Sequence, residues 1–357
     1  MENIHKDSNF AKAFYFLASI TIFFWAINGL SNILTPIAIA ILIWFLINAF
    51  ADQIKRIPFL NNKIGEYISI PLSLVIIVYL MFEIGSFIAS SMFTLSSTIS
   101  SLDGKVMQLI EKLSVLTSFD LVTPLQKILQ EFSLAMVINK VISAFSTIFG
   151  NIVQILLYVL FLLLDQRFFN IKLNALFPNN EHKNRAKHIL ISISQSIKTY
   201  ISITTIISLA TGFLTYLICE YFSLEGAVLW GFIAFVLNFI PTIGSIIAVL
   251  IPTIFAFIQL SLISDVLILF TLLIIIQFVL GNIVQPRMMG DKLNISQFIV
   301  ILSLVVWGAM WGTIGMFLSV PLMVILLIIF SQFESTKKLA ILISGDGNIL
   351  GISQSIK

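Results

Sequence analysis

Polar and helix-breaking residues interrupt a long apolar run between residues 226 and 260, which carries no charged side chain. The interruption reads Asn238-Phe-Ile-Pro241-Thr-Ile-Gly244-Ser245. Proline lacks a backbone N–H and clashes with the preceding turn, so Pro241 predicts a broken helix. If the run lies in a membrane, such a break must be buried in protein or line a cavity. Its free amide and carbonyl groups can bind a polar solute without a side-chain charge. We therefore assign Asn238, Pro241, Gly244 and Ser245 to a candidate solute or ion pathway.

A second long apolar run, from 298 to 330, also lacks charge and has an interruption of its own. It contains Gly308, Gly312 and Gly315, and Pro321 follows. Two interrupted runs on either side of an ordinary span are expected of transporters whose discontinuous helices meet near the middle of the bilayer. We therefore add these four residues to the pathway. The alternative is that the glycines only let helices pack closely, as small residues do in membranes.

Two further features could take part in transport. The segment Gln285-Pro286-x-x-x-Gly290 lies between the two interrupted runs and completes the candidate pathway. Glu83 is the one carboxylate in the middle of a predicted span. Because a carboxylate is costly there and usually functional or paired, Glu83 is a candidate for coupling transport to protons. The alternative is that it hydrogen-bonds a neighbour or lies at a subunit contact.

The rest of the sequence excludes most enzyme chemistry. It has no G-x-x-x-x-G-K-[ST] phosphate-binding loop, so transport by this chain would be secondary or passive. The three histidines, His5, His182 and His188, fall in polar segments and offer no intramembrane metal or catalytic site. We therefore predict no catalytic residue, no metal, no cofactor and no enzymatic activity. The net charge of +3 is too small to predict nucleic-acid binding.

Composition predicts an all-α, polytopic transmembrane protein. The 357 residues are 59% hydrophobic and only 10% charged, whereas soluble domains carry about 25% charged residues. A bilayer core needs about 20 apolar residues per helix. Six full spans are expected near 14–30, 33–50, 70–91, 141–164, 200–221 and 262–283. Residues 93–140 are too polar to span and show helical amphipathic spacing, which predicts surface or partner-binding helices.

Lys and Arg in short loops mark the cytoplasmic side of a membrane protein. The N-terminus, segments 51–67 and 165–199 and the C-terminus are basic, so we expect both termini in the cytoplasm. The two long interrupted runs are then expected to be re-entrant hairpins; long kinked spans are the alternative. Five regions result: three N-terminal spans (1–92), external amphipathic helices (93–140), a fourth span with a basic cytoplasmic loop (141–199), a transport region with broken helices (200–335) and a cytoplasmic tail (336–357).

In the two interrupted runs and the segment between them, the chain resembles the autoinducer-2 exporter (AI-2E) family of bacterial membrane proteins. The resemblance covers residues 10–335. It departs from the family at Ser245 and at 297–298, where prolines are common. It rests on three motifs in order: Asn238-x-x-Pro241-x-x-Gly244, Gln285-Pro286-x-x-x-Gly290 followed by Leu293, and Gly308-x-x-x-Gly312-x-x-Gly315 with Pro321. It implies a multispanning inner-membrane transporter, with some members linked to autoinducer-2 and others to sodium–proton exchange.

The sequence thus predicts a secondary transporter or exporter of a small polar solute, either an autoinducer-2-like signal or another metabolite. A proton or sodium gradient would drive it across the bacterial inner membrane. Expected partners are the solute or an ion, membrane lipid and further copies of the chain. Two alternatives stay open: a sodium/proton antiporter, and a non-transporting oligomeric scaffold or pore that uses residues 93–140 as its interaction surface.

Overall fold

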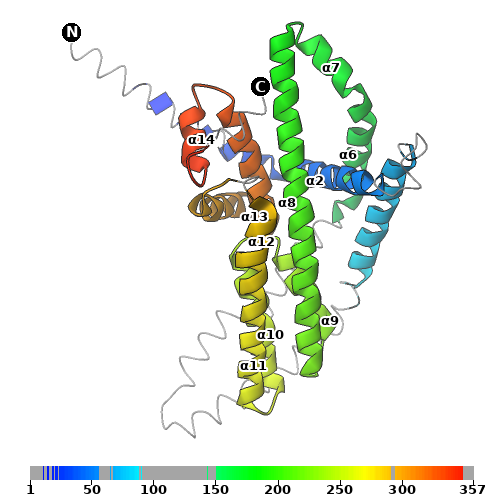
Figure 1. Cartoon of the computed structure of the whole chain (residues 1–357), viewed down its shortest axis with the longest axis vertical. Helices are drawn as coiled ribbons and strands as arrows, with labels where there is room; N and C mark the ends of the chain where they lie inside the picture. Colours follow the sequence, from blue (N-terminus) through cyan, green and yellow to red (C-terminus); the bar gives the residue numbers. More distant parts are fainter. Residues whose placement is uncertain are drawn as a thin grey trace, which may run out of the picture.

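A computed structural model describes residues 24–55, 67–87, 150–290 and 294–348, with scattered residues between 11 and 22 and at 65, 90 and 143. Every regular element in these ranges is helical, which confirms the predicted all-α class (Figure 1). The described residues between 11 and 29 are helical as well. The predicted external amphipathic segment at 93–140 lies outside the described residues.

Three N-terminal helices pack on one another: α2 (Ser31–Ile54), the helix Tyr67–Phe87 and α6 (Ile152–Asp165). Their shared core is aliphatic and consists of Ala40, Ile47, Ile77, Ile155 and Val159. The Trp44 indole N–H donates to Gln166 Oε1 over 2.8 Å, which joins α2 to the segment after α6. These contacts hold α6 against α2.

The segment that we expected to be a basic loop, 165–199, is helical. A short 3₁₀ turn, η2 (Gln166–Phe168), leads into α7 (Phe169–Leu176) and then α8 (Asn180–Tyr221). The Asn179 side chain accepts a hydrogen bond from the Glu181 N–H and caps α8. Isoleucines four residues apart then continue the apolar stripe of the fifth span toward this cap: Ile189, Ile193, Ile197 and Ile201. With 42 residues, α8 is about 63 Å long, twice a bilayer core.

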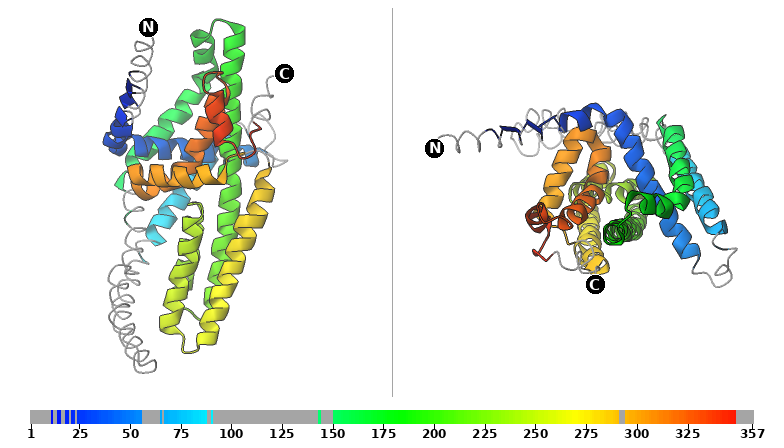
Figure 2. Two further views of the ribbon diagram at one scale, coloured as in Figure 1. Left: turned by 90° about the vertical axis from the view of Figure 1, so that its left-hand side faces the viewer. Right: turned by 90° about the horizontal axis from the view of Figure 1, so that it is seen from above.

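The first interrupted run forms a helical hairpin, α9 (Ala227–Leu237) and α10 (Ile243–Gln259), which we name the first hairpin. At its base, the Glu225 N–H donates to Gln259 Oε1, and Gln259 Nε2 donates to the Ser223 carbonyl. Both ends of the run therefore meet at the same end of α8, beside the start of α11 (Ile263–Phe278) (Figure 2). This arrangement confirms the predicted hairpin and excludes one long kinked span.

The second interrupted run, α13 (Gln297–Ser331), also folds back on itself and is named the second hairpin. Gly312 has non-helical backbone angles, φ 61° and ψ −144°, and divides the run into a first arm (297–311) and a second arm (313–331). A Cβ on Gly315 would lie 1.9 Å from the Trp307 carbonyl oxygen, eight residues earlier. Only a chain reversal brings these residues so close, and Figure 2 shows the two orange arms diverging from one tip.

Between the hairpins, α11 passes into a π-helix, η3 (Val279–Val284), and then into α12 (Gln285–Met289). Pro286 explains this irregularity, because its missing N–H cannot bond the carbonyl one turn earlier. After α13, residues from the expected tail form α14 (Lys337–Ile343), with Ala340 and Ile343 buried against Leu327. Part of the predicted tail is therefore a folded element.

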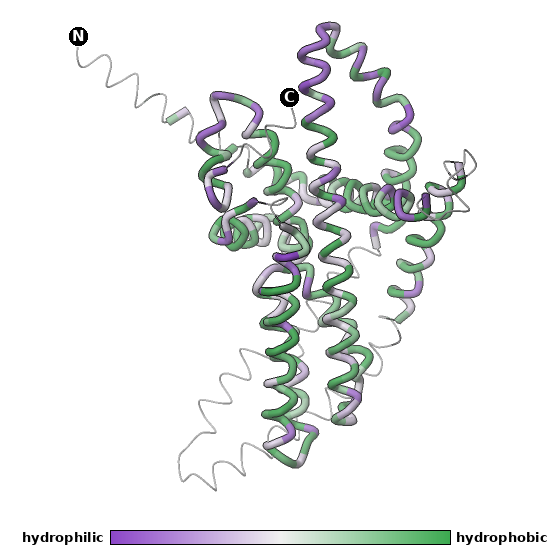
Figure 3. The backbone as a smooth tube through the Cα atoms, viewed as in Figure 1, coloured by the Kyte–Doolittle hydropathy of each residue, from purple (hydrophilic) through white to green (hydrophobic). Residues whose placement is uncertain are grey.

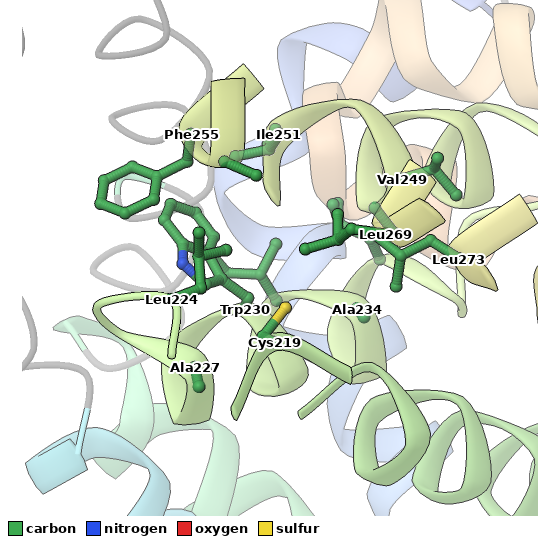
Figure 4. Packing of buried hydrophobic residues seen from close by; sticks show 14 of the residues in the cluster. Cys219, Leu224, Ala227, Trp230, Ala234, Val249, Ile251, Phe255, Leu269 and Leu273 are labelled. Carbon is green, nitrogen blue, oxygen red and sulfur yellow. The ribbon is translucent and has the colours of Figure 1, made fainter. Parts of the chain in front are cut away.

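The largest apolar core lies between the first hairpin, α8 and α11 (Figure 4). Trp230 is 1% exposed, and its ring lies 5.0 Å from that of Phe255 across the hairpin. Six helices, the second hairpin included, are long and apolar enough to span a bilayer. Apolar residues predominate along the described helices, whereas the Asn180 end of α8 is polar (Figure 3). The chain is therefore a multi-pass membrane protein.

Candidate functional site

A pocket of about 290 Å³ lies where the tip of the second hairpin meets the first turns of α2 and α6. This volume is close to the lower end for ligand pockets, so the pocket would hold a small solute. The residues that line it are Ser31, Asn32, Thr35, Pro36, Ile39, Asn151, Ile155, Met310, Trp311 and Ile314.

Uncharged polar side chains line the side of the pocket formed by α2 and α6. Ser31, Asn32 and Thr35 lie within the first five residues of α2, and their spacing places them on one helix face. Asn151 directly precedes α6. Together these residues offer two hydroxyl and two amide groups, each able to donate and to accept hydrogen bonds. None of the described residues that line the pocket carries a charge, so the arrangement suits a neutral polar ligand.

The opposite side of the pocket is built by the tip of the second hairpin. Met310, Trp311 and Ile314 lie on both sides of the turn at Gly312. The Trp311 indole N–H points to the Ile27 carbonyl over 3.5 Å, and its ring lies 5.2 Å from that of Trp307. A large aromatic face opposite hydroxyl and amide groups can contact the apolar face of a small polar molecule.

The predicted glycines form this turn and do not line the pocket themselves. Gly312 supplies the positive φ angle, which favours glycine. Gly315 and Gly308 let the arms approach, since a Cβ on Gly308 would lie 2.9 Å from Met316 Cγ. Pro321 is buried farther along the second arm. Gly308 and Gly315 thus lie at close approaches, as the close-packing alternative expects, whereas Gly312 has open space around it. A direct contact of any of these glycines with solute stays a prediction.

The tip of the first hairpin contacts α8 far from the end of α8 at which the hairpin begins. Asn238 Nδ2 donates to Ser208 Oγ over 3.0 Å, and Ser208 is 13 residues before the end of α8 at Tyr221. At 1.5 Å per residue the tip is about 20 Å from the hairpin base. Ser245 Oγ donates to the Thr242 carbonyl over 2.8 Å. Asn238 therefore anchors the tip to α8, and Pro241 and Gly244 shape the turn.

The two tips approach each other without sharing the pocket. The rings of Phe239, next to Asn238, and Phe317, on the second arm, are stacked with centroids 5.0 Å apart. Phe317 lies one turn beyond the pocket residue Ile314. The structure therefore brings the two predicted groups of pathway residues together through an aromatic contact, with the pocket on the side of the second hairpin.

This arrangement can be compared with known proteins. A family profile described as "AI-2E family transporter" matches residues 14–335. The chain belongs to the AI-2E transporter family. The chain is 27% identical over 340 residues to the AI-2 transport protein TqsA of Escherichia coli strain K12, covering 94% of this chain and 96% of that protein. It is 28% identical over 351 residues to a protein of Haemophilus influenzae named as a candidate transport protein, covering 95% and 98%.

In this AI-2E family member, the remaining predicted site residues do not line the pocket. Gln285 and Pro286 start α12, and Gly290, with φ 54°, ends it. Glu83 is exposed on the helix Tyr67–Phe87 and hydrogen-bonds Tyr79 one turn earlier. Their roles in transport stay predictions.

Sequence reasoning missed the residues of the AI-2E chain that line the polar side of the pocket. The predicted spans 14–30 and 33–50 leave residues 31 and 32 between them, yet Ser31 and Asn32 begin α2. The available signal was the spacing of Ser31 and Thr35, two hydroxyls on one face of an apolar helix. Asn151 gave no comparable signal, because nothing in the sequence shows that α6 starts beside α2.

Proposed function

We propose that this AI-2E family member transports a small uncharged polar solute, which binds in the pocket between α2, α6 and the second hairpin. The observation that carries the proposal is the lining: the described residues around the pocket offer hydroxyl, amide and indole groups, and none of them is charged. A dedicated ion site would need carboxylates or several converging oxygens in place of this mixed polar and apolar surface.

The solute class is narrowed by the relative TqsA, whose name states AI-2 transport. We propose an autoinducer-2-like signal or a metabolite of similar size and polarity, exported across the bacterial inner membrane. The chain has no phosphate-binding loop, so a proton or sodium gradient is the proposed source of energy.

Orientation and assembly are part of the same proposal. The basic end of α8 carries Lys183, Arg185 and Lys187, and basic segments favour the cytoplasm. The Arg185 guanidinium lies 5.4 Å from the Phe333 ring, so the C-terminal segment is at this same end. We propose that both termini are cytoplasmic. We also propose a homo-oligomer, in which the exposed face with Glu83 contacts another subunit.

Flux into proteoliposomes tests the pocket. Thr35→Val keeps the side-chain shape but removes a hydroxyl, so we expect the KM for labelled autoinducer-2 to rise about fivefold, the cost of one hydrogen bond. Thr271→Val is the matched control, because Thr271 is exposed on α11 and its hydroxyl bonds the Leu267 carbonyl of its own helix. Unchanged flux in Thr35→Val and Asn32→Ala together would show that solute does not bind in this pocket.

A sodium/proton antiporter is the second candidate, favoured by one observation: a carboxylate, Glu83, within a spanning helix. In that case a sodium gradient would move protons without any organic solute, and Glu83→Gln would abolish the exchange. We expect no such exchange. Solute flux that depends on a proton or sodium gradient, and persists in Glu83→Gln, would support the proposed transporter over the antiporter.

A further inference from the structure

The C-terminal segment 337–348 lies against both ends of the second hairpin at once. Its helix α14 buries Ala340 and Ile343 against Leu327, at the end of the second arm. The same cluster includes Ile295 and Ile299, where the first arm begins. A single apolar contact therefore joins the beginning and the end of a hairpin whose tip lines the pocket.

Hydrogen bonds join the same two segments. The Ser296 N–H donates to the Ile343 carbonyl over 2.9 Å, and the Gly345 N–H donates to the Asn294 carbonyl over 3.3 Å. These two bonds run in the antiparallel sense and place Ile295 opposite Ser344. We name the pairing of 294–296 with 343–348, together with α14, the C-terminal clasp.

Asn294 is the centre of the clasp. Its amide nitrogen donates to Asp346 Oδ1 and, over 3.0 Å, to the Asn348 carbonyl. Its amide oxygen accepts from the Gly345 N–H over 3.0 Å. The hydrogen bond from Asn294 and that from the Asn348 N–H hold the pKa of Asp346 below its ordinary value. The hydrogen bonds of the clasp therefore favour the carboxylate form of Asp346.

We propose that Asn294 and Asp346 are positioning residues for the pocket, which hold the base of the second hairpin so that its tip faces α2 and α6. The expected effect of the clasp on transport rests on the proposed function, whereas its effect on the position of the hairpin does not. The arm between Gln297 and Trp311 is about 22 Å long, so a small rotation at its base displaces the tip by several ångström. The first arm is helical without interruption from Gln297 to Trp311, so it can carry such a rotation to Trp311.

Hydrogen exchange of the full-length chain tests the clasp without any solute. In Asp346→Ala, we expect amides at the second-hairpin tip, 307–314, to exchange about threefold faster than in the unaltered chain. Asp346→Asn keeps the Oδ1 acceptor but loses the charge that the clasp favours, so its exchange should lie between that of the unaltered chain and that of Asp346→Ala. Glu334→Ala is the matched control, because it removes a neighbouring ion pair to Lys337 that is exposed to solvent. Equal exchange in Asp346→Ala and Glu334→Ala would overturn the proposal.

A disulfide provides the rescue experiment. Residues opposite each other between such antiparallel bonds have Cα atoms about 4.5 Å apart, within disulfide range. The pair Ile295→Cys and Ser344→Cys, placed in the Asp346→Ala background, should restore slow exchange and solute KM when oxidised and lose both when reduced. The native thiol, Cys219, is fully buried and will not interfere. If oxidation restores neither exchange nor KM, the clasp does not position the hairpin.

Exchange and flux together separate the two proposals. Faster tip exchange in Asp346→Ala with an about threefold higher KM supports both. Faster exchange with unchanged flux would support the clasp as a positioning device for the hairpin. The same result would contradict transport through the pocket. Unchanged exchange contradicts the clasp whatever the flux.

Discussion

At the residue scale, the two hairpin turns use glycine in the same way. In each turn, one residue takes a positive φ angle: Thr242 in the first and Gly312 in the second. A glycine that follows it lies against a carbonyl of the opposite arm, and the two glycines are Gly244 and Gly315. The second glycine closes the hairpin, because any side chain there would occupy the place of a backbone oxygen.

Gly315→Ala tests this close approach. Its Cβ would lie 1.9 Å from the Trp307 carbonyl oxygen, which belongs to backbone and cannot move aside alone. The arms must separate, and we expect a cost of about 3 kcal/mol, the upper range for overpacking. Thermal unfolding in detergent measures it. Gly281→Ala is the control, since its Cβ would meet nothing within 4 Å. Equal melting temperatures for the two variants would contradict the tight turn.

At the element scale, the sequence predicted the hairpins well, for a simple physical reason. An uncharged run too long for one span and broken by Pro241 or Gly312 has few alternatives in a bilayer. The N-terminal extension of α8 was not predicted. The isoleucines from Ile189 to Ile197 lie among charged and polar residues, so the segment has the composition of a loop. The pocket was not predicted either, because it depends on packing between α2, α6 and the second hairpin, which no local pattern records.

The contact between the hairpins predicts energetic coupling. Phe239 and Phe317 stack at 5.0 Å, and aromatic pairs contribute about 0.5–1.5 kcal/mol beyond their buried area. We expect Phe239→Leu and Phe317→Leu to be non-additive by about 1 kcal/mol in thermal unfolding. Phe255→Leu combined with Phe317→Leu is the control, because Phe255 packs on Trp230 in the core of the first hairpin. Strict additivity in the stacked pair would show that the two hairpins are independent.

At the scale of the whole molecule, α8 is the element that joins the parts. The first hairpin packs along its Tyr221 end, with Gly212 and Gly231 in close contact. Farther along, Lys198 forms a 2.6 Å ion pair with Asp52 at the end of α2. Tyr200 and Ile201 pack against the second arm of the second hairpin. The long helix therefore determines how the hairpins and the N-terminal helices lie relative to one another.

This architecture predicts which residues face each side of the membrane. Lys187 and Tyr221 are 34 residues apart on α8, or about 51 Å, so a bilayer core of about 30 Å fits between them. Ser223 and Ser261, both exposed, lie at the two ends of the first hairpin. In intact cells, a membrane-impermeant maleimide should label Ser223→Cys and Ser261→Cys but reach Lys187→Cys only after the membrane is opened.

The buried Cys219 provides an unreactive background for this experiment. Ser223→Cys and Ser261→Cys report on the first hairpin, and Lys187→Cys reports on α8. Labelling of Ser223→Cys and Ser261→Cys from opposite sides would contradict the first hairpin. Labelling of Lys187→Cys from the same side as Ser223→Cys would contradict α8 as a membrane-spanning helix. Lys338→Cys should follow Lys187→Cys, since the contact of Arg185 with Phe333 places the C-terminal clasp at that end of α8.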